Sequence, residues 1–309
     1  MSALTGRATR RAFLAGGATA AGTFLFPMGV GLGAEEDTSF LLIGDWGSPS
    51  GGEGEVARAM ATFAAKAQSR FVISLGDNFY SKGVASTADP RWILGFEDIF
   101  AADSLQIPWY VILGNHDYEG NIQAQIDYSK VSSRWRMPAA YYTHRETLAD
   151  GALADFFFLD TNLLVYKAAA RHSGLDPFAE IDWLREQLSR SPARWKLAIG
   201  HHPILSGGEK HGSYPILIEK VKPLFEQYGV VAYFNGHDHN MQHVQMDGVH
   251  YFTCGTGSEP KAVGTLPETR FAASELGFME ARLGSDVLQV QFLDTAGATL
   301  HSAEIFGGD

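Results

Sequence analysis

The sequence predicts an α/β protein built on a mixed β-sheet, and two observations support this class. Five short apolar runs of strand type each end in glycine, and helical stretches lie between them. Later segments alternate apolar and polar residues, as half-buried strands do. Strand–helix alternation followed by further strands is typical of sheets that mix parallel and antiparallel pairs. We expect one domain over residues 35–309, after an export segment at residues 1–34.

Each of the five apolar runs is followed by glycine and then by a residue that can bind a metal ion. Buried strands read as continuous apolar runs, and open α/β sheets gather their ligands outside the carboxyl ends of the strands. Taken singly, a Gly-Asp or Gly-His pair is better explained as a turn. We expect the glycines to allow positive φ and close backbone approach. The runs are 40–43, 71–75, 110–113, 197–199 and 230–235, and the residues after the glycines are Asp45, Asp77, Asn115, His201 and His237.

The remaining segments carry helix and strand signals. Asp176-Pro177 is a helix start signal, and Thr295-Ala296-Gly297 fits a turn between two strands. We expect helices at 53–68, 90–100, 178–189 and 214–228, and strands at 249–254, 277–283 and 287–293, with a last strand through residue 305.

The residues around the five glycines offer oxygen and nitrogen ligands and no thiolate. Asp77 and Tyr80 lie in Gly-Asp-Asn-Phe-Tyr, and His237 and His239 lie in Gly-His-Asp-His. Such donors suit iron, manganese and zinc in a hydrolytic site, and they argue against an iron–sulfur cluster or a cysteine-based structural zinc. The two-residue spacing of His237 and His239 sends both rings to the same side of an extended segment. We therefore predict a site for two metal ions.

With these motifs the chain resembles the purple acid phosphatases of the metallophosphoesterase superfamily. The small mammalian-type enzymes, also called tartrate-resistant acid phosphatases, are the most similar group. The resemblance covers most of residues 39–260 and is carried by Leu75–Gly83, Pro108–Asp117, Gln123–Lys130 with Arg134-Trp135, and Gly229–Gln242. It implies a four-layer sandwich of two packed mixed β-sheets flanked by helices, with the metals at one edge.

The resemblance also implies a role for each ligand. Asp77 matches the carboxylate that bridges the two metals, and Tyr80 matches the phenolate that makes the family purple. The alternative for Tyr80 is an aromatic side chain that only packs in the core or a turn. Hard anionic oxygens suit Fe(III), whereas neutral amide and imidazole groups suit divalent Fe, Zn or Mn. The ferric site would comprise Asp45, Tyr80 and His239, and the divalent site Asn115, His201 and His237.

The implied activity is that of an acid phosphatase, in which a metal-bound hydroxide attacks a phosphate monoester. Lewis-acidic Fe(III) keeps hydroxide available below neutral pH, which favours an acid optimum. His116 matches an outer-sphere histidine of the family, and we expect Asp117 to orient its ring. His202 follows the ligand His201, and His211 is the candidate for another substrate-contacting histidine.

Two alternatives stay open. A phosphodiesterase or nucleotide-hydrolysing metallophosphoesterase with two divalent metals would be colourless. A periplasmic iron-binding or redox protein could use the same centre without turnover, although His116, His202 and His211 would then have no purpose. Five histidines lie outside the ligand clusters, and we expect them to be at the surface or locally hydrogen-bonded rather than catalytic: His144, His172, His243, His250 and His301. Asn240 and Gln242 match the family's pattern but need only be structural.

The N-terminal segment carries an export signal. Thr9–Leu14 reads Thr-Arg-Arg-Ala-Phe-Leu, a twin-arginine motif, and a mildly apolar stretch follows to about Ala34. Glycines and Pro27 interrupt that stretch, which favours a cleaved signal over a membrane anchor. We therefore expect a bacterial protein that the twin-arginine machinery delivers to the periplasm or the medium.

Composition and charge limit the classes of partner that the protein is expected to bind. The net charge is −11, and it becomes −14 without residues 1–34, which carry three arginines and no acids. Such a chain does not attract nucleic acid, so we expect a small phosphoester as the partner. The single Cys254 excludes an intramolecular disulfide, and we expect it to fill a buried strand end. Residues 163–176 and 205–214 resemble the family least, so neither the substrate nor loop regulation follows from the resemblance.

Overall fold

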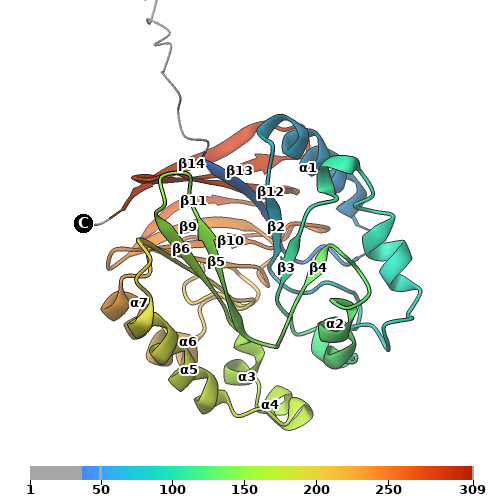
Figure 1. Cartoon of the computed structure of the whole chain (residues 1–309), viewed down its shortest axis with the longest axis horizontal. Helices are drawn as coiled ribbons and strands as arrows, with labels where there is room; N and C mark the ends of the chain where they lie inside the picture. The colour runs from blue at the N-terminus through green and yellow to red at the C-terminus, as the bar shows by residue number, and fades with distance from the viewer. Residues whose placement is uncertain (1–36, 49–50, 308–309) are drawn as a thin grey trace, which may run out of the picture. The chain divides into compact units, whose positions relative to one another are not determined.

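The computed structural model describes residues 37–48 and 51–307. The expected export segment, residues 1–34, lies outside these ranges. Within the unit of residues 35–309, two mixed sheets of seven strands each are flanked by helices, as Figure 1 shows. The predicted four-layer sandwich is therefore confirmed.

The first sheet carries three of the five apolar runs. Its strands are β1 (Thr38–Ile43), β2 (Phe71–Ser74), β3 (Trp109–Val111), β4 (Trp135–Arg136), β12 (Gly277–Leu283), β13 (Val287–Asp294) and β14 (Thr299–Phe306). Their order is β14-β13-β12-β1-β2-β3-β4. The pairs from β1 to β4 are parallel and those from β1 to β14 are antiparallel. All six residues of β1 are buried, which explains why its sequence does not alternate.

The second sheet carries the other two apolar runs. Its strands are β5 (Tyr142–Thr147), β6 (Leu153–Phe158), β7 (Trp195–Ile199), β8 (Ala232–Asn235), β9 (Met241–Met246), β10 (Val249–Cys254) and β11 (Thr269–Ala273). Their order is β11-β9-β10-β8-β7-β6-β5. The pairs β6–β7, β7–β8 and β8–β10 are parallel. Cys254 ends β10 as a buried free thiol, in agreement with the sequence.

Helices cover the outer face of each sheet. The α-helices are α1 (Glu53–Ala67), α2 (Ile122–Tyr128), α3 (Thr161–Val165), α4 (Lys167–Ser173), α5 (Pro177–Arg190), α6 (Pro215–Lys220) and α7 (Lys222–Tyr228), and the shorter turns are η1 (Ile93–Glu97), η2 (Asp103–Leu105) and η3 (Asp117–Glu119). In Figure 1, α1 and α2 lie beside the first sheet, whereas α3 to α7 lie beside the second. Among the described residues, no helix is both long and apolar enough to span a bilayer.

Two of the four predicted helices differ from expectation. The helix predicted at 214–228 is two helices that meet at Val221, because Pro223 has no N–H for a continuous helix and its ring clashes with the preceding turn. The segment predicted at 90–100 contains the π-helix η1, with the Asp98 N–H bonded to the carbonyl of Ile93. The helices at 53–68 and 178–189 are confirmed as α1 and α5.

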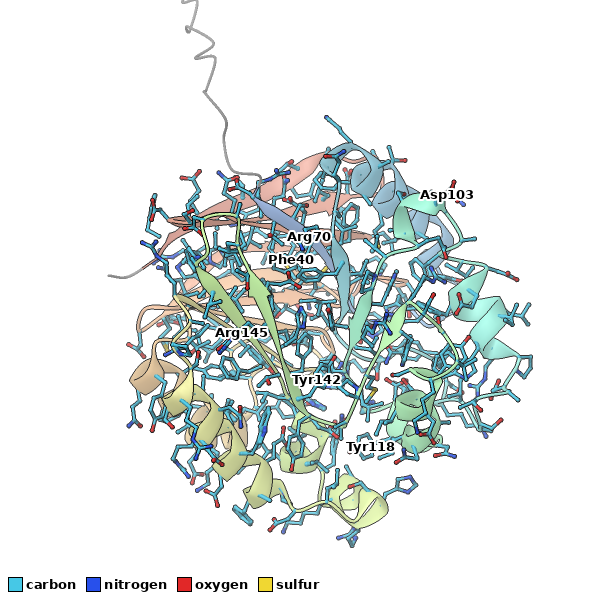
Figure 2. All side chains as sticks on the ribbon, in the orientation of Figure 1. Phe40, Arg70, Asp103, Tyr118, Tyr142 and Arg145 are labelled. Carbon is cyan, nitrogen blue, oxygen red and sulfur yellow. The ribbon has the colours of Figure 1, made fainter. Side chains whose placement is uncertain are left out.

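The main core lies between the two sheets. Phe40 of β1 stacks on Phe71 of β2 with ring centroids 4.8 Å apart, and both meet Phe156 of β6 edge-on. Figure 2 places Phe40 in this dense interior. A second apolar cluster joins the outer face of the second sheet to α5, α6 and α7. Packing on both faces therefore fixes the positions of the parallel strand ends.

Candidate dinuclear metal centre

The five predicted ligand loops lie together at one edge of the two sheets. Asp45, Asp77 and Asn115 follow β1, β2 and β3, and His201 and His237 follow β7 and β8. Backbone hydrogen bonds tie the loops to one another, since the N–H of Asp45 donates to the carbonyl of Gly76 (3.0 Å) and that of Gly236 donates to His201 (3.2 Å). The sheets thus bring carboxylate, amide and imidazole donors to one place.

The unusual backbone at this edge falls mainly on the ligand residues. Asp45, Asp77 and His237 have φ of 58°, 52° and 68°, whereas among the five junction glycines only Gly76 has a positive φ, 90°. The expectation of positive φ at every glycine is therefore wrong. The close-approach argument holds instead, because a Cβ on Gly114 would lie 2.1 Å from Oδ1 of Asp77. The positive φ values of Asp45, Asp77 and His237 are strained for residues with a Cβ, and strained conformations cluster at functional sites.

Tyr80 lies at the centre of a group of acidic oxygens. Its hydroxyl is 2.8 Å from Oδ2 of Asp77, 3.0 Å from Oδ1 of Asp45 and 3.2 Å from Nε2 of His239. A hydroxyl has one proton, so it can donate to only one of the two carboxylates at a time. Burial, and then the charges of Asp45 and Asp77, raise the pKa of Tyr80 well above its usual value. A cation of high charge would relieve this crowding.

A second group of donors converges on His201. Its Nδ1 faces the carbonyl oxygen of Leu75 (2.8 Å), so Nδ1 carries the proton and Nε2 presents a lone pair. That lone pair lies 3.2 Å from Oδ1 of Asn115 and 3.2 Å from Nδ1 of His237. The Tyr214 hydroxyl, 2.7 Å from Nε2 of His237, can accept the Nε2 proton and leave Nδ1 free for a metal.

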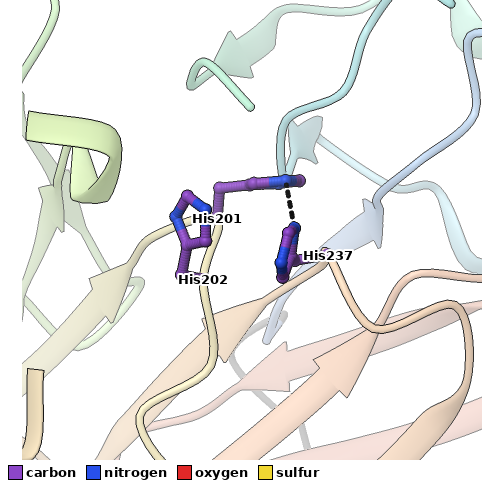
Figure 3. A group of neighbouring side chains, drawn as sticks. All are labelled: His201, His202 and His237. Carbon is purple, nitrogen blue, oxygen red and sulfur yellow. Dashed lines mark hydrogen bonds between the residues drawn. The ribbon is translucent and has the colours of Figure 1, made fainter. Parts of the chain in front are cut away.

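Asp77 connects the two groups. Its Oδ2 contacts Tyr80, whereas its Oδ1 lies 3.5 Å from Nε2 of His201 and accepts the backbone N–H of His116 at 2.9 Å. Donor atoms of Asp45, Asp77 and His201 lie within 4.8 Å of one another. Figure 3 shows the neighbouring rings of His201, His202 and His237. The donor set therefore fits two cations that share one carboxylate.

His239 supports the same interpretation. Its Nδ1 is buried and has no hydrogen-bond partner within residues 37–48 and 51–307. The ring faces Asp45 through Nε2, 3.4 Å from Oδ1. Burial opposes a charge on this ring, but the hydrogen bond and the charge of Asp45 raise its pKa. The carboxylate of Asp45 thus favours positive charge at the position of the His239 ring.

Asp117 has a different environment from the one expected. Its carboxylate accepts hydrogen bonds from the backbone N–H of Gly114 (2.8 Å) and of Asn78 (3.1 Å), and from Nε2 of Gln125 (2.7 Å). Burial and the charge of Asp77 raise its pKa to about 6. These hydrogen bonds hold the loop of Gly114, and none of the three goes to the His116 ring. The expectation that Asp117 orients that ring is therefore wrong, because its oxygens accept hydrogen bonds from the backbone N–H groups of two buried loops.

His116 is oriented by the backbone instead. Its Nδ1 lies 2.6 Å from the carbonyl oxygen of Ser81, so the proton is on Nδ1 and Nε2 faces away from this contact. The ring packs on Tyr80 with centroids 4.5 Å apart. The partly exposed imidazole thus lies directly beside the two candidate ligand groups.

His202 is completely buried, and Thr161 fixes its tautomer. The Thr161 hydroxyl accepts the backbone N–H groups of His201 (3.2 Å) and His202 (3.0 Å), so it donates its own proton to Nδ1 of His202 at 2.8 Å. The remaining proton is on Nε2, which finds no partner in the described part of the chain. His202 therefore presents no lone pair to a metal, and it packs against His237 at 4.4 Å between ring centroids.

His211 lies at the site on a loop that hydrogen bonds to Asp238 and Gln242 hold in place. Its exposed ring lies 4.1 Å from that of His237. The loop is held because Ser206 donates to Asp238, while Gln242 accepts the N–H of Gly207 at 2.7 Å. Gln242 thus has the structural role expected for it.

The structure adds residues that the sequence analysis missed. Strand β6 also ends at this edge, and it is followed by Asp160, Thr161 and Asn162, all buried. Asn162 donates to the carbonyl of Leu113, at the end of β3 (3.0 Å). The available signal was an apolar run at residues 156–159 followed by three polar residues, but no glycine separates them.

Comparison with known proteins assigns the family. The model of calcineurin-like phosphoesterases matches residues 38–241, a range that contains all seven candidate ligands. Tartrate-resistant acid phosphatase type 5 of Oryctolagus cuniculus is 38% identical over 243 residues, which cover 73% of this chain and 74% of the relative. Purple acid phosphatase 17 of Arabidopsis thaliana is 34% identical over 298 residues, covering 87% and 84%.

The chain belongs to the purple acid phosphatases, within the calcineurin-like phosphoesterase family.

Solved structures agree on the fold of this purple acid phosphatase. GAP50, described as the anchor in the inner membrane complex of Plasmodium, superposes with a TM-score of 0.79 at 26% identity, covering 88% of this chain and 90% of its own. A purple acid phosphatase from yellow lupin seeds gives a TM-score of 0.67 at 15% identity, covering 88% and 54%. Because one of these is described as an anchor, the fold alone does not decide function, and the residues of the site must do so.

Proposed function

We propose that this purple acid phosphatase hydrolyses phosphate monoesters at a centre of Fe(III) and a divalent ion, Fe, Zn or Mn. The observation that carries the proposal is the division of the donors around Asp77. One side holds a phenol, a carboxylate and one imidazole, and the other holds an amide and two imidazoles with no anionic group of its own. Hard anionic donors favour a trivalent ion and neutral ones a divalent ion. We assign Asp45, Tyr80 and His239 to Fe(III), Asn115, His201 and His237 to the divalent ion, and Asp77 to both.

Two bound cations would supply Lewis acidity and an activated water for attack on phosphorus. The side chains around them would position the ester and donate a proton to the departing alcohol oxygen. His116 and His211 are the partly exposed imidazoles at the site, so we propose that they contact the substrate and the leaving oxygen. His202 is buried, and we propose that it positions the His237 ring. Asp117 would act through the loop of Gly114.

We also propose a bacterial protein that the twin-arginine machinery exports to the periplasm or medium, without a membrane anchor. The motif at Thr9–Leu14 and the interrupted apolar stretch support this. The acidic net charge supports a small phosphoester rather than nucleic acid as partner. Replacement of Arg10 and Arg11 by lysine should leave the protein in the cytoplasm. Undiminished appearance outside the cytoplasm would remove this part of the proposal.

The decisive experiment is the visible absorption spectrum of the purified protein with its metals quantified, before and after Tyr80→Phe. We expect a purple or pink band from phenolate bound to Fe(III), and its loss in the variant. A colourless wild-type protein with two divalent metals would instead support a phosphodiesterase or nucleotide-hydrolysing enzyme.

The remaining alternative is an iron-binding or redox protein without turnover. His116→Ala separates the two functions, because His116 contributes no atom to the two donor groups apart from its backbone N–H to Asp77. We expect hydrolysis of a phosphate monoester to fall about a hundredfold, as for loss of a general acid, with both metals retained. Unchanged hydrolysis would contradict the role of His116, and absence of hydrolysis in the metal-loaded wild-type protein would favour the iron-binding alternative.

A further inference from the structure

We propose that a pocket beside Asn115 binds a flat, uncharged ring on the alcohol part of the phosphate ester. This inference rests on the proposed phosphatase function and narrows its substrate class. The pocket has a volume of about 410 Å³ and lies between the loop after β3 and helix α4. Its lining includes Asn115, Tyr118, Glu119, Tyr166, Ala169 and His172.

The pocket is continuous with the candidate metal centre. Asn115 lines the pocket, and its Oδ1 lies 3.2 Å from Nε2 of His201. A phosphate held at the metals would therefore have this space within reach of its ester oxygen. Volumes of this size are typical of small-molecule sites, and such sites often join an apolar wall to a few polar groups.

Tyr118 forms a fixed wall of the pocket. Its hydroxyl donates to Oδ2 of the buried Asp160 at 2.5 Å, which anchors the far end of the ring. Figure 2 places Tyr118 beside the α3 and α4 segment. The ring of His172 packs edge-on against it, with centroids 6.3 Å apart. Because the hydroxyl is already bonded, Tyr118 offers the pocket mainly its aromatic surface.

Tyr166 forms a second wall of the pocket, and its ring packs against a buried histidine. Its ring meets that of His202 edge-on at 5.2 Å between centroids. His202 is itself completely buried and also packs edge-on against Tyr214, at 5.0 Å between ring centroids, so the surface behind Tyr166 is fixed. A ring that enters the pocket would therefore meet aromatic surfaces already in place, so little side-chain entropy would be lost on binding.

Helix α4 leaves the space for the ligand. Ala168 and His172 are four residues apart on one face of the helix, and Ala169 is next to them. The two alanines fill little volume. Glu119, an exposed carboxylate, also lines the pocket, so we commit to an uncharged ring rather than an anionic one.

The test compares benzyl phosphate with ethyl phosphate, which differ by a ring but both leave as alkoxides. We expect Tyr166→Ala to lower the ratio of their kcat/KM values about tenfold, which corresponds to about 1.4 kcal/mol for the lost aromatic contact. Tyr166→Phe should restore the ratio because it keeps the ring. Ala168→Trp should also lower the ratio by filling the pocket, whereas Ala170→Trp, on the other side of α4, should not.

A binding measurement keeps the pocket separate from catalysis. Benzylphosphonate and ethylphosphonate cannot be hydrolysed, and calorimetry gives their dissociation constants for each variant. An unchanged preference in both Tyr166→Ala and Ala168→Trp would overturn the proposal. If the wild-type protein hydrolyses neither ester, the phosphatase function fails, but the phosphonate preference still decides whether the pocket binds a ring.

Discussion

The molecule contains two buried groups of histidines that differ in how their nitrogens are used. In the candidate metal centre, Nε2 of His201 faces Asn115 and Asp77 as a lone pair. In the second group, the inter-sheet histidine chain of His243, His250 and His301, each ring bonds to another ring. His243 Nδ1 lies 3.0 Å from His301 Nε2, and His243 Nε2 lies 2.9 Å from His250 Nδ1.

The inter-sheet histidine chain satisfies itself without a cation. Nε2 of Gln245 donates to Nε2 of His250 at 3.2 Å, which places the His250 proton on Nδ1. His250 then donates to His243, and His243 donates to His301, so three neutral rings form a directed chain from β9 and β10 to β14. His243 also stacks on Phe252 with centroids 4.4 Å apart.

This difference shows what makes buried histidines a metal site. The two nitrogens of His243 point to opposite partners, so the three rings cannot converge on one ion. Within residues 37–48 and 51–307, the hydrogen-bond partners of these three rings are histidines and Gln245, and none is a carboxylate. The centre, by contrast, places carboxylates against lone pairs at loops of positive φ. Convergent lone pairs and negative charge, rather than the number of histidines, distinguish the two groups.

Replacing one histidine from each group gives the largest expected contrast. We expect His201→Ala to lower kcat at least about a thousandfold, because a lost metal removes several kcal/mol of transition-state stabilisation. His243→Ala should keep both metals and most activity at 25 °C while lowering the free energy of unfolding. Metal analysis, kinetics and urea unfolding measure these effects. Loss of metal from His243→Ala would show that the two groups are not independent.

Two glycine substitutions sharpen the comparison at the level of the backbone. A Cβ on Gly114 would lie 2.2 Å from the backbone nitrogen of Asp77, so Gly114→Ala must displace this loop, and we expect about a hundredfold less activity. Gly248, in the turn between β9 and β10, has φ of 81° with open space around it. Gly248→Ala should cost about 1 kcal/mol of stability and leave activity unchanged. Equal losses of activity in both variants would contradict this.

The sequence predicted the strand ends around the candidate centre well where the signal is local. The strand ends at Asp45, Asp77 and His237 show an apolar run, a glycine and a donor within a few residues, and all lie where expected. Thr161 acts on His202 across 41 positions, and His301 meets His243 across 58, so neither contact has a local pattern. The hairpin of β5 and β6 was also missed, since β5 is mostly polar and only its first residue, Tyr142, is buried.

Acid pH should affect the inter-sheet histidine chain through its protonation. Burial, with the charges of its neighbours and of Arg270, lowers the pKa of His243 to about 3, and burial with Arg270 lowers that of His250 to about 4. The ordinary value is about 6.5, so between pH 6.5 and 4 the unfolded chain binds more protons. The two neutral rings cost the folded protein no stability above pH 6.5. The free energy of unfolding therefore decreases as the pH falls below this value. We expect about 2 kcal/mol for each of the two rings, roughly thirtyfold each in the folding equilibrium, between pH 7 and 4.5.

The variant His250→Gln isolates this effect from acid loss of metal. It removes one of the titrating groups, so its free energy of unfolding should depend less on pH than that of the wild-type protein. Both proteins are unfolded with urea after chelation of metals at pH 7 and pH 4.5. Parallel pH dependence in the two proteins would exclude the chain as a source of acid sensitivity.

The smallest effect is expected at Thr161, which belongs to the centre but contributes no donor to a metal. Its hydroxyl satisfies two backbone N–H groups and fixes the tautomer of His202. Thr161→Val keeps the shape and removes these three contacts, so we expect up to about tenfold lower kcat, with unchanged metal content, because the His202 ring can then rotate beside His237. Thr161→Ser keeps the hydroxyl and should retain activity near that of the wild-type protein. If serine fails as badly as valine, packing of the methyl group, rather than the hydroxyl, positions this ring.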